Sequence, residues 1–179
     1  MLTGSDLDFF NLCFKLAETA YKAQEVPVGC VIVTNEVVIG TGFNQVNRTK
    51  NPTRHAEFVA IAEANEWCTL HNENFIETMK RATFYVNLEP CIMCASALYQ
   101  LRIKRLIFGA KNPRFGGIYS VVSNADFGHD HEIEITSEIE KDRCISLLRT
   151  FYDRENTFAP EEKRKSKKKF QIELVCRRF

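Results

Sequence analysis

The chain has 179 residues, a net charge of +1 and seven cysteines. This length fits one domain with at most a short appendage, and no apolar run approaches the ~18 residues that a membrane-spanning helix needs. The first residues lack the basic and apolar regions of a secretory signal peptide, and an odd, unevenly spaced set of cysteines disfavours a secreted disulfide framework. We therefore expect an intracellular protein without a membrane partner, whose thiols are free for packing or for a metal.

The charge is divided unevenly along the chain. Residues 1–160 hold 16 Lys or Arg and 20 Asp or Glu, a charge of −4, whereas residues 161–179 hold 8 and 3, a charge of +5. The second segment contains Lys163, Arg164, Lys165, Lys167, Lys168 and Lys169. We therefore expect a domain over residues 1–160 followed by a basic C-terminal tail over residues 161–179. Such a tail indicates a polyanionic partner, usually a nucleic acid, although a solubilising or nuclear-targeting segment has the same composition.

A helix followed by a hairpin is expected at the start of the chain. Residues 6–23 are amphipathic, and Ser5 with Asp8 resembles a capping box at their start, so the pattern predicts a helix. Two β-branched runs, 30–33 and 37–39, flank a short polar turn and predict a β-hairpin.

The middle of the chain predicts two helices around a strand. A polar loop over 44–52 precedes the alanine-rich residues 55–65, which predict a helix buried against a sheet. The stretch 67–80 is polar and irregular. A strand is predicted at 83–86, and the proline that follows is expected to open a helix over 90–100, because proline is favoured in the first helical turn.

The rest of the domain predicts two further strands and a helix. Residues 105–108 have the pattern of a short strand, 132–135 could form another, and 137–152 predict a closing helix. Strands that alternate with helices favour an α/β domain built in layers. Because the first two strands form a hairpin, the sheet should be mixed rather than wholly parallel.

Two motifs carry residue types capable of metal chemistry, His55-Ala56-Glu57 and Pro90-Cys91-Ile92-Met93-Cys94. Cysteine and histidine are ligands that zinc prefers, and three protein ligands leave the fourth tetrahedral position for water, as a catalytic site needs. Cys91 and Cys94 are one helical turn apart, so both sulfurs can face one ion. His55 and Glu57 do not share a face of a regular helix, so they can converge only where a helix begins.

Glu57 is the candidate catalytic residue. A carboxylate beside zinc-bound water can take its proton and pass protons to a ring nitrogen and a departing amine. A His-x-Glu motif followed by Pro-Cys-x-x-Cys is the known signature of zinc-dependent nucleobase deaminases. The motifs therefore predict a Zn²⁺ site formed by His55, Cys91 and Cys94, with Glu57 as the general acid and base.

Two other interpretations of these cysteines stay open. Cys68-x-x-His71 followed by Cys91-x-x-Cys94 has the spacing of a structural, four-ligand zinc site, in which the His-x-Glu motif would merely begin a core helix. Alternatively, Cys91 and Cys94 are buried core thiols, because free cysteine is among the most buried residue types.

The motifs resemble the cytidine-deaminase-like fold and, within it, the tRNA adenosine deaminases, which make inosine at the wobble position (34) of the anticodon. The resemblance covers roughly residues 7–160. Further matching pieces are Pro27-Val28-Gly29, Gly42-Phe43-Asn44, Phe108-Gly109-Ala110-Lys111-Asn112 and Arg114-Phe115-Gly116-Gly117. The resemblance implies a three-layer α/β/α fold with a mixed, roughly five-stranded central sheet. After Gly117 the chain departs from the pattern, because Ile118 and Tyr119 stand where relatives often have small residues.

The resemblance also implies roles for particular residues and partners. Asn44 matches the residue that hydrogen-bonds the target nucleoside, and Val28 lies where relatives pack the base. Alternatively, Asn44 is only a turn residue after a strand, and Val28 only packs within the core beside its strand. The sequence of residues 114–117 and the basic tail are most similar to the catalytic subunit of the eukaryotic enzymes. This similarity implies tRNA as the substrate and a heterodimer with a deaminase-like partner that lacks the catalytic glutamate.

Two other functions compete with tRNA deamination. An enzyme of the same fold could act on free cytidine, deoxycytidylate or guanine, and such substrates would not need the basic tail. A non-catalytic, zinc-containing RNA-binding subunit is the other alternative. Glu57 argues against the latter, because a purely structural role gives no reason for a carboxylate beside an open metal position.

Overall fold

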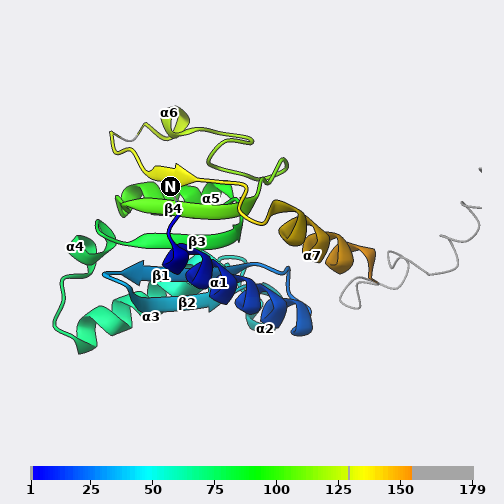
Figure 1. The fold of residues 1–179 in the computed structure, drawn as a ribbon, viewed down its shortest axis with the longest axis horizontal. Coiled ribbons are helices and arrows are strands. Elements are labelled where there is room, and N and C mark those ends of the chain that lie inside the picture. The colour runs from blue at the N-terminus through cyan, green and yellow to red at the C-terminus, as the bar shows by residue number, and fades with distance from the viewer. Residues whose placement is uncertain (1, 129, 155–179) are drawn as a thin grey trace, which may run out of the picture.

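A computed structural model describes residues 2–128 and 130–154 of the chain, and its centre is a five-stranded sheet (Figure 1). The elements in chain order are α1 (Gly4–Lys22), β1 (Gly29–Thr34), β2 (Val37–Phe43), α2 (Val46–Thr49), α3 (Ala56–Leu70), α4 (Phe75–Met79), β3 (Thr83–Leu88), α5 (Ile92–Gln100), β4 (Arg105–Ala110), α6 (Asn124–Phe127), β5 (Glu134–Thr136) and α7 (Lys141–Asp153). The predicted domain boundary at residue 160 and the basic tail lie outside the described residues.

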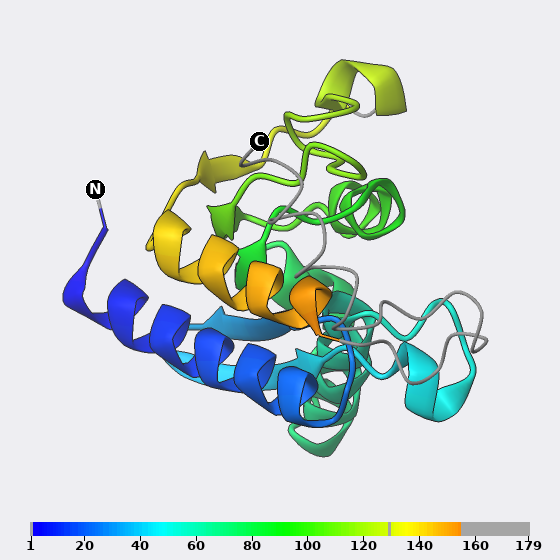
Figure 2. The same cartoon turned by 90° about the vertical axis from the view of Figure 1, so that its right-hand side faces the viewer.

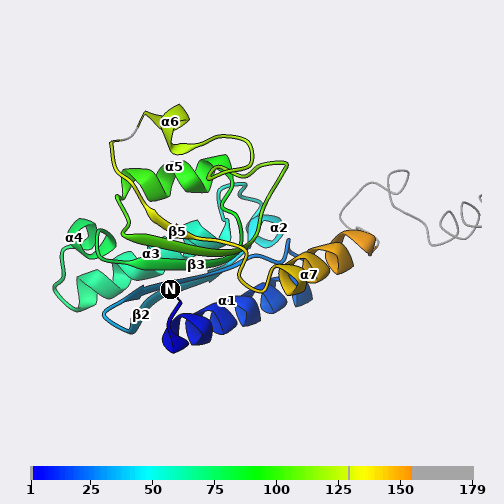
Figure 3. The ribbon, with the colours of Figure 1, turned by 45° about the horizontal axis from the view of Figure 1, so that its top comes forward.

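The two faces of the sheet are covered by different helices. Side chains along a strand point alternately to opposite faces, and in β1 Cys30 and Ile32 join the core with α3 and α5, whereas Val31 and Val33 join the core with α1 and α7. Figure 3 shows these two pairs of helices on opposite sides of the sheet, and Figure 2 shows α1 and α7 side by side. The prediction of three layers around a mixed, five-stranded sheet is confirmed.

The topology brings four chain segments to one edge of the sheet. The strand order is β2-β1-β3-β4-β5; β1 is antiparallel to β2 and β3, and β3 is parallel to β4 and β4 to β5. The start of β1 therefore lies beside the ends of β2, β3 and β4. The residues next to these strand ends are Val28, Asn44, Glu89 and Lys111. Ligands commonly bind outside the carboxyl ends of strands in open α/β sheets, so this edge is the expected place for a pocket.

Close packing of α3 on β2 brings the first turn of α3 to this edge. Gly42 makes the approach possible, because a Cβ atom at this position would lie 2.2 Å from the carbonyl oxygen of Ala56. The small side chains of Ala56, Ala60 and Ala64 are fully buried in the same contact region. A larger residue at position 42 would push the start of α3 away from the sheet.

The capping box of α1 lies two residues earlier than predicted. Thr3 accepts a hydrogen bond from the Asp6 N–H (3.1 Å), and the Asp6 carboxylate accepts one from the Thr3 N–H (2.8 Å). Asp6 is buried and also accepts hydrogen bonds from the Tyr85 hydroxyl (2.7 Å) and the Arg105 guanidinium (3.0 Å). Burial alone would raise the pKa of Asp6, but these donors outweigh it and lower the pKa. Contacts with β3 and β4 therefore decide which aspartate caps the helix.

The prediction of an irregular segment at 67–80 is wrong. Helix α3 continues to Leu70 and α4 occupies Phe75–Met79, because Cys68 and Met79 are buried apolar anchors within this polar stretch. Other differences are smaller: α5 begins at Ile92 and not at the proline, β5 covers Glu134–Thr136, α7 begins at Lys141, and the loop after β2 contains α2. Within residues 2–128 and 130–154, no helix combines the length and the apolar character needed to cross a membrane.

Candidate active site

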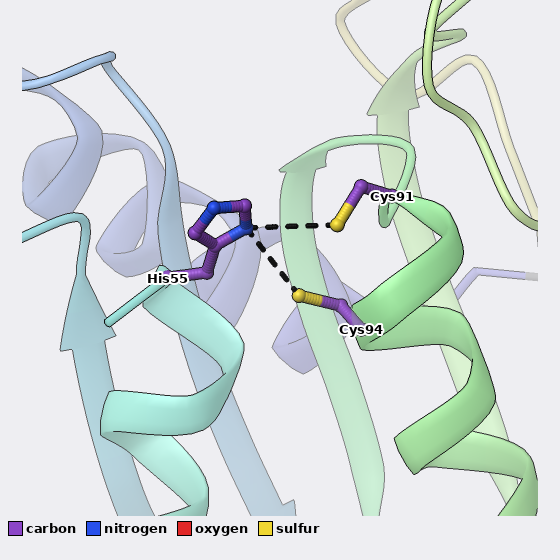
Figure 4. Close-up of side chains that lie close together, drawn as sticks. All are labelled: His55, Cys91 and Cys94. Carbon is purple, nitrogen blue, oxygen red and sulfur yellow. Dashed lines mark hydrogen bonds between the residues drawn. The ribbon is translucent and has the colours of Figure 1, made fainter. Parts of the chain in front are cut away.

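The side chains of His55, Cys91 and Cys94 converge at the pocket edge of the sheet (Figure 4). His55 is the N-cap residue of α3, Cys91 is the N-cap residue of α5, and Cys94 lies within the first turn of α5. The His55 Nδ1 atom is 3.6 Å from each of the two sulfur atoms. All three candidate ligand atoms lie within 4.8 Å of one another.

The donor set and its spacing fit a zinc ion. Around a tetrahedral Zn²⁺, a sulfur at ~2.3 Å and a nitrogen at ~2.05 Å from the metal lie about 3.6 Å apart, which matches both distances to His55 Nδ1. One nitrogen and two sulfurs make three protein ligands, as in catalytic zinc sites. The three residues that the sequence predicts as ligands are therefore brought together at a spacing that fits zinc.

Hydrogen bonds within the cluster favour a thiolate at Cys91. The bond from the Cys94 thiol, assisted by His55, lowers the pKa of Cys91 to about 4. The same bond, together with burial, raises the pKa of Cys94, and the bond to Cys91 raises the pKa of His55. The cluster is thus an anionic sulfur pair sharing one proton beside an imidazole, and a metal ion binds such sites by displacing the proton.

The alternative four-ligand zinc site is not formed. Cys68 is buried in the core, and the ring of His71 stacks on Trp67 at 4.0 Å between centroids, with Nδ1 2.8 Å from the Trp67 carbonyl oxygen. Within residues 2–128 and 130–154, the cluster at His55 is the one group of three or more such side chains close enough to hold an ion. Local packing explains Cys68 and His71 without a metal.

Glu57 lies beside this cluster but outside its set of candidate ligands. It occupies the first turn of α3, and the extended backbone of His55 immediately before it (φ −74°, ψ 159°) lets both side chains reach the same place. Glu57 is only 3% exposed. Burial, with a smaller contribution from the charge of Cys91, raises the pKa of its carboxyl group to about 7. This group can therefore hold or release a proton near neutral pH.

A cavity of about 750 Å³ opens in front of the cluster. Val28 and Asn44, both predicted as substrate-binding residues, line it. The Asn44 side-chain oxygen accepts a hydrogen bond from the Ala56 N–H (2.9 Å), and its backbone N–H donates to the Val28 carbonyl oxygen (3.1 Å). Asn44 therefore holds the start of α3 against the sheet as well as facing the cavity.

Several pocket residues were not singled out from the sequence as site residues. The further side chains around the cavity include Glu25, Glu89, Ile92, Met93, Lys111, Arg114, Phe115, Leu148 and Tyr152. The last two come from α7, more than fifty residues after the second cysteine motif, and no local pattern indicates that α7 reaches the pocket. Glu89, directly before the Pro-Cys motif, could have been recognised from the sequence as a site residue. A carboxylate at the end of a buried strand is costly unless it has hydrogen-bonding partners.

Two of these residues are buried carboxylates that bind backbone N–H groups. Glu25 accepts hydrogen bonds from the N–H groups of Asn47 (3.0 Å) and Arg48 (2.8 Å) and so holds α2 at one side of the cavity. Glu89 accepts bonds from the loop after β4. Burial alone would raise the pKa of Glu89, but donors that include the Asn112 N–H and the Ser120 hydroxyl outweigh it and lower the pKa.

Comparison with known proteins agrees with this geometry. Residues 3–110 match the family described as the cytidine and deoxycytidylate deaminase zinc-binding region. The chain is 42% identical over 156 residues to tRNA-specific adenosine deaminase 2 of Danio rerio, covering 84% of this chain and 72% of the relative. It is 39% identical over 171 residues to the protein of the same name from Xenopus tropicalis, covering 93% of this chain and 99% of the relative.

A solved structure extends this similarity to three dimensions. It comes from a study of A-to-I editing by tRNA:A34 deaminases at the wobble position of transfer RNA. The two folds superimpose with a TM-score of 0.69 and 31% identity, over 79% of this chain and 99% of the other. The chain belongs to the cytidine and deoxycytidylate deaminase family and, within it, to the tRNA-specific adenosine deaminases.

Proposed function

We propose that this chain catalyses the hydrolytic deamination of adenosine to inosine at the wobble position (34) of tRNA. The observation that carries the proposal is the position of Glu57, a buried carboxyl group with a pKa near neutral beside a three-ligand cluster that fits zinc. The names of the relatives supply the substrate class.

His55, Cys91 and Cys94 would hold the ion through one nitrogen and two sulfurs, which leaves one position open to the cavity. Bound there, zinc supplies Lewis acidity that makes water a nucleophile at neutral pH.

Glu57 is assigned the proton transfers. As a carboxylate it accepts a proton from the attacking water, and as a carboxylic acid it donates that proton to the ring nitrogen. It then accepts the second proton, from the hydroxyl group newly bonded to the ring carbon, and donates it to the departing amine. Water and adenosine thereby become inosine and ammonia. A pKa near 7 suits both tasks, because a general acid–base works best when its pKa lies close to the operating pH.

Val28 and Asn44 are assigned to substrate binding. Val28 provides an apolar surface against the base, and Asn44 offers a carboxamide whose oxygen is already held by the Ala56 N–H. Lys111 and Arg114 place two cationic side chains at the same cavity. Cationic side chains are the usual partners of phosphate groups, so the cavity suits a nucleotide within an RNA better than a free base.

A deaminase-like subunit without the catalytic glutamate is proposed as the partner. In addition to the family resemblance, exposed apolar side chains lie beside the cavity, where the Ile92 N–H donates to the Phe115 carbonyl oxygen and the Val121 N–H to that of Gly116. The exposed fractions are 41% for Ile92, 52% for Phe115, 54% for Tyr119 and 49% for Val121. Exposed apolar side chains close to a functional cavity are candidates for a protein interface.

The direct test of function compares substrates. The purified zinc-loaded chain, alone and with a candidate deaminase-like subunit, is incubated with tRNA and, separately, with cytidine, deoxycytidylate and guanine. The deaminated products inosine, uridine, deoxyuridylate and xanthine are measured. We expect inosine at position 34 of tRNA, with much more product when the partner is present. Turnover of free cytidine, deoxycytidylate or guanine without any inosine in tRNA would support the small-molecule alternative. Full activity of the chain as a homodimer would remove the partner from the proposal.

Replacement of a proposed ligand should reduce metal binding. His55→Ala removes the nitrogen donor, so we expect bound zinc to fall well below the one ion per chain of the wild type, measured by elemental analysis after dialysis against a weak chelator. His71→Ala, at the C-terminal end of the same helix, is the matched control and should keep its zinc. Loss of zinc from the control but not from His55→Ala would restore the four-ligand alternative.

Replacement of the proposed acid–base should strongly reduce turnover without disturbing the metal. In Glu57→Gln we expect kcat to fall by about 10²–10⁴-fold, while the zinc content and tRNA affinity stay at the wild-type level. Glu66→Gln, on the exposed side of α3, controls for the loss of a carboxylate from this helix and should be fully active. Glu57→Gln activity within a few-fold of wild type would contradict the assigned role.

The basic tail is proposed to bind RNA through phosphate contacts. Replacing Lys167, Lys168 and Lys169 with Gln should flatten the log–log slope of tRNA affinity against salt by about 2 units, because each phosphate contact to a single strand contributes roughly 0.7. Deaminase chemistry on a small substrate, if detectable, should survive the change. An unaltered slope together with unaltered tRNA affinity would show that the tail serves another purpose, such as nuclear targeting.

A further inference from the structure

The carboxylate of Glu89 is the centre of a dense hydrogen-bond cluster next to the metal-ligand segment. The residue follows β3, lies two positions before Cys91 and is only 1% exposed. Its Oε1 atom accepts hydrogen bonds from the N–H groups of Ile118 (3.2 Å), Tyr119 (2.7 Å) and Ser120 (3.0 Å). Its Oε2 atom accepts from the Asn112 N–H (2.8 Å) and from the Ser120 hydroxyl.

These donors come from both ends of one loop, residues 111–120, which contains no helix or strand of its own. Asn112 lies at its start and Ser120 at its end, so one carboxylate closes the loop. The part between them faces the cavity, through Pro113, Arg114 and Phe115. Glu89 therefore holds a loop that contributes a cationic and an aromatic side chain to the lining of the pocket.

The loop is shaped to enclose this carboxylate. A Cβ atom at Gly116 would lie 2.4 Å from the carboxyl carbon of Glu89, so the backbone can close over the carboxylate only because no side chain is present. The Gly117 N–H donates to the Pro90 carbonyl oxygen (2.8 Å), and the Ile92 N–H donates to the Phe115 carbonyl oxygen (2.9 Å). The loop is thus attached to the same short segment that begins α5.

The same hydrogen bonds argue against a catalytic role for Glu89 itself, because they occupy its carboxylate oxygens. An ionised carboxylate has about four acceptor sites, and five donors within the protein already occupy those of Glu89. Although Glu89 lines the cavity, the hydrogen bonds of its carboxylate are made to the loop and not to a substrate.

We infer that Glu89 is a positioning residue, which holds the loop 111–120 as the substrate-recognition wall of the pocket and thereby sets how tightly the RNA is bound. The inference rests on the proposed function for the identity of the substrate, but the attachment of the loop to Glu89 rests only on the hydrogen bonds. Ile118 adds a second attachment for the loop, because its side chain is buried in the core while its N–H group, like that of Tyr119, donates to Glu89.

Glu89→Gln tests the inference with little change in shape. The amide would place an NH₂ group against backbone donors, so the loop loses part of its attachment. We expect KM for tRNA to rise about tenfold or more, as for loss of hydrogen bonds to a charged group, while kcat stays within about threefold. Glu89→Asp retains the charge on a shorter side chain and should recover part of the loss. A lower kcat with unchanged KM would overturn the inference.

A second readout does not depend on activity. Trypsin can cleave after Lys111 and Arg114, both within the loop, and the rate of cleavage in the zinc-loaded full chain reports how firmly the loop is held. We expect Glu89→Gln to speed cleavage at these two sites by about tenfold or more while zinc remains bound. The matched control is Glu25→Gln, which weakens the attachment of α2 through Asn47 and Arg48 and should leave cleavage at Lys111 and Arg114 unchanged.

Ser120→Ala keeps the test decisive if Glu89→Gln does not fold. It removes one donor and leaves the carboxylate and its other partners in place, so cleavage should speed up and KM should rise by a few-fold. Unchanged cleavage in the folded variants would refute the positioning role. If the wild type failed to deaminate tRNA, the proposed function would fall, but the cleavage rates would still decide whether Glu89 holds the loop.

Discussion

The N-terminal ends of α3 and α5 meet at one edge of the sheet, and their separation decides whether the chain can bind a metal at all. His55 and Cys91 are 36 residues apart in sequence, yet each is the N-cap residue of its helix and their ligand atoms are 3.6 Å apart. Both helices pack on the same face of the sheet. The close approach at Gly42 sets the position of α3, so backbone packing, and not the reacting side chains, sets this distance.

Once the helix ends are in place, three buried glutamates perform different tasks around one cavity. Glu57 has a raised pKa because burial dominates its environment. Glu89 has a lowered pKa because donors from one loop outweigh burial, and Glu25 holds the N–H groups of α2. Burial and hydrogen bonding shift a carboxyl pKa in opposite directions. The number of N–H groups aimed at each carboxylate therefore separates Glu57, the proposed proton carrier, from the structural anchors Glu25 and Glu89.

Much of the fold was predictable because its strands and helices are locally consistent. The hairpin, the parallel strand–helix–strand unit around the cysteine motif and the mixed sheet follow from runs of β-branched residues and the spacing of apolar residues. The predictions are wrong where contacts with segments distant in sequence determine the local structure. Asp6 caps α1 because Tyr85 and Arg105 bind its carboxylate, and the polar stretch at 67–80 is helical because Cys68 and Met79 are buried by other segments.

The residue types of the site and their local spacing are readable from the sequence alone. Cysteines three positions apart must share one side of a helical turn, and a histidine two positions before a glutamate can join it only where a helix begins. The packing of distant segments determines that His55, and not Cys68 or His71, completes the cluster. It also determines that α7 and the loop held by Glu89 form walls of the cavity. Local spacing specifies which neighbouring side chains can meet, whereas contacts between distant segments depend on how helices and strands pack.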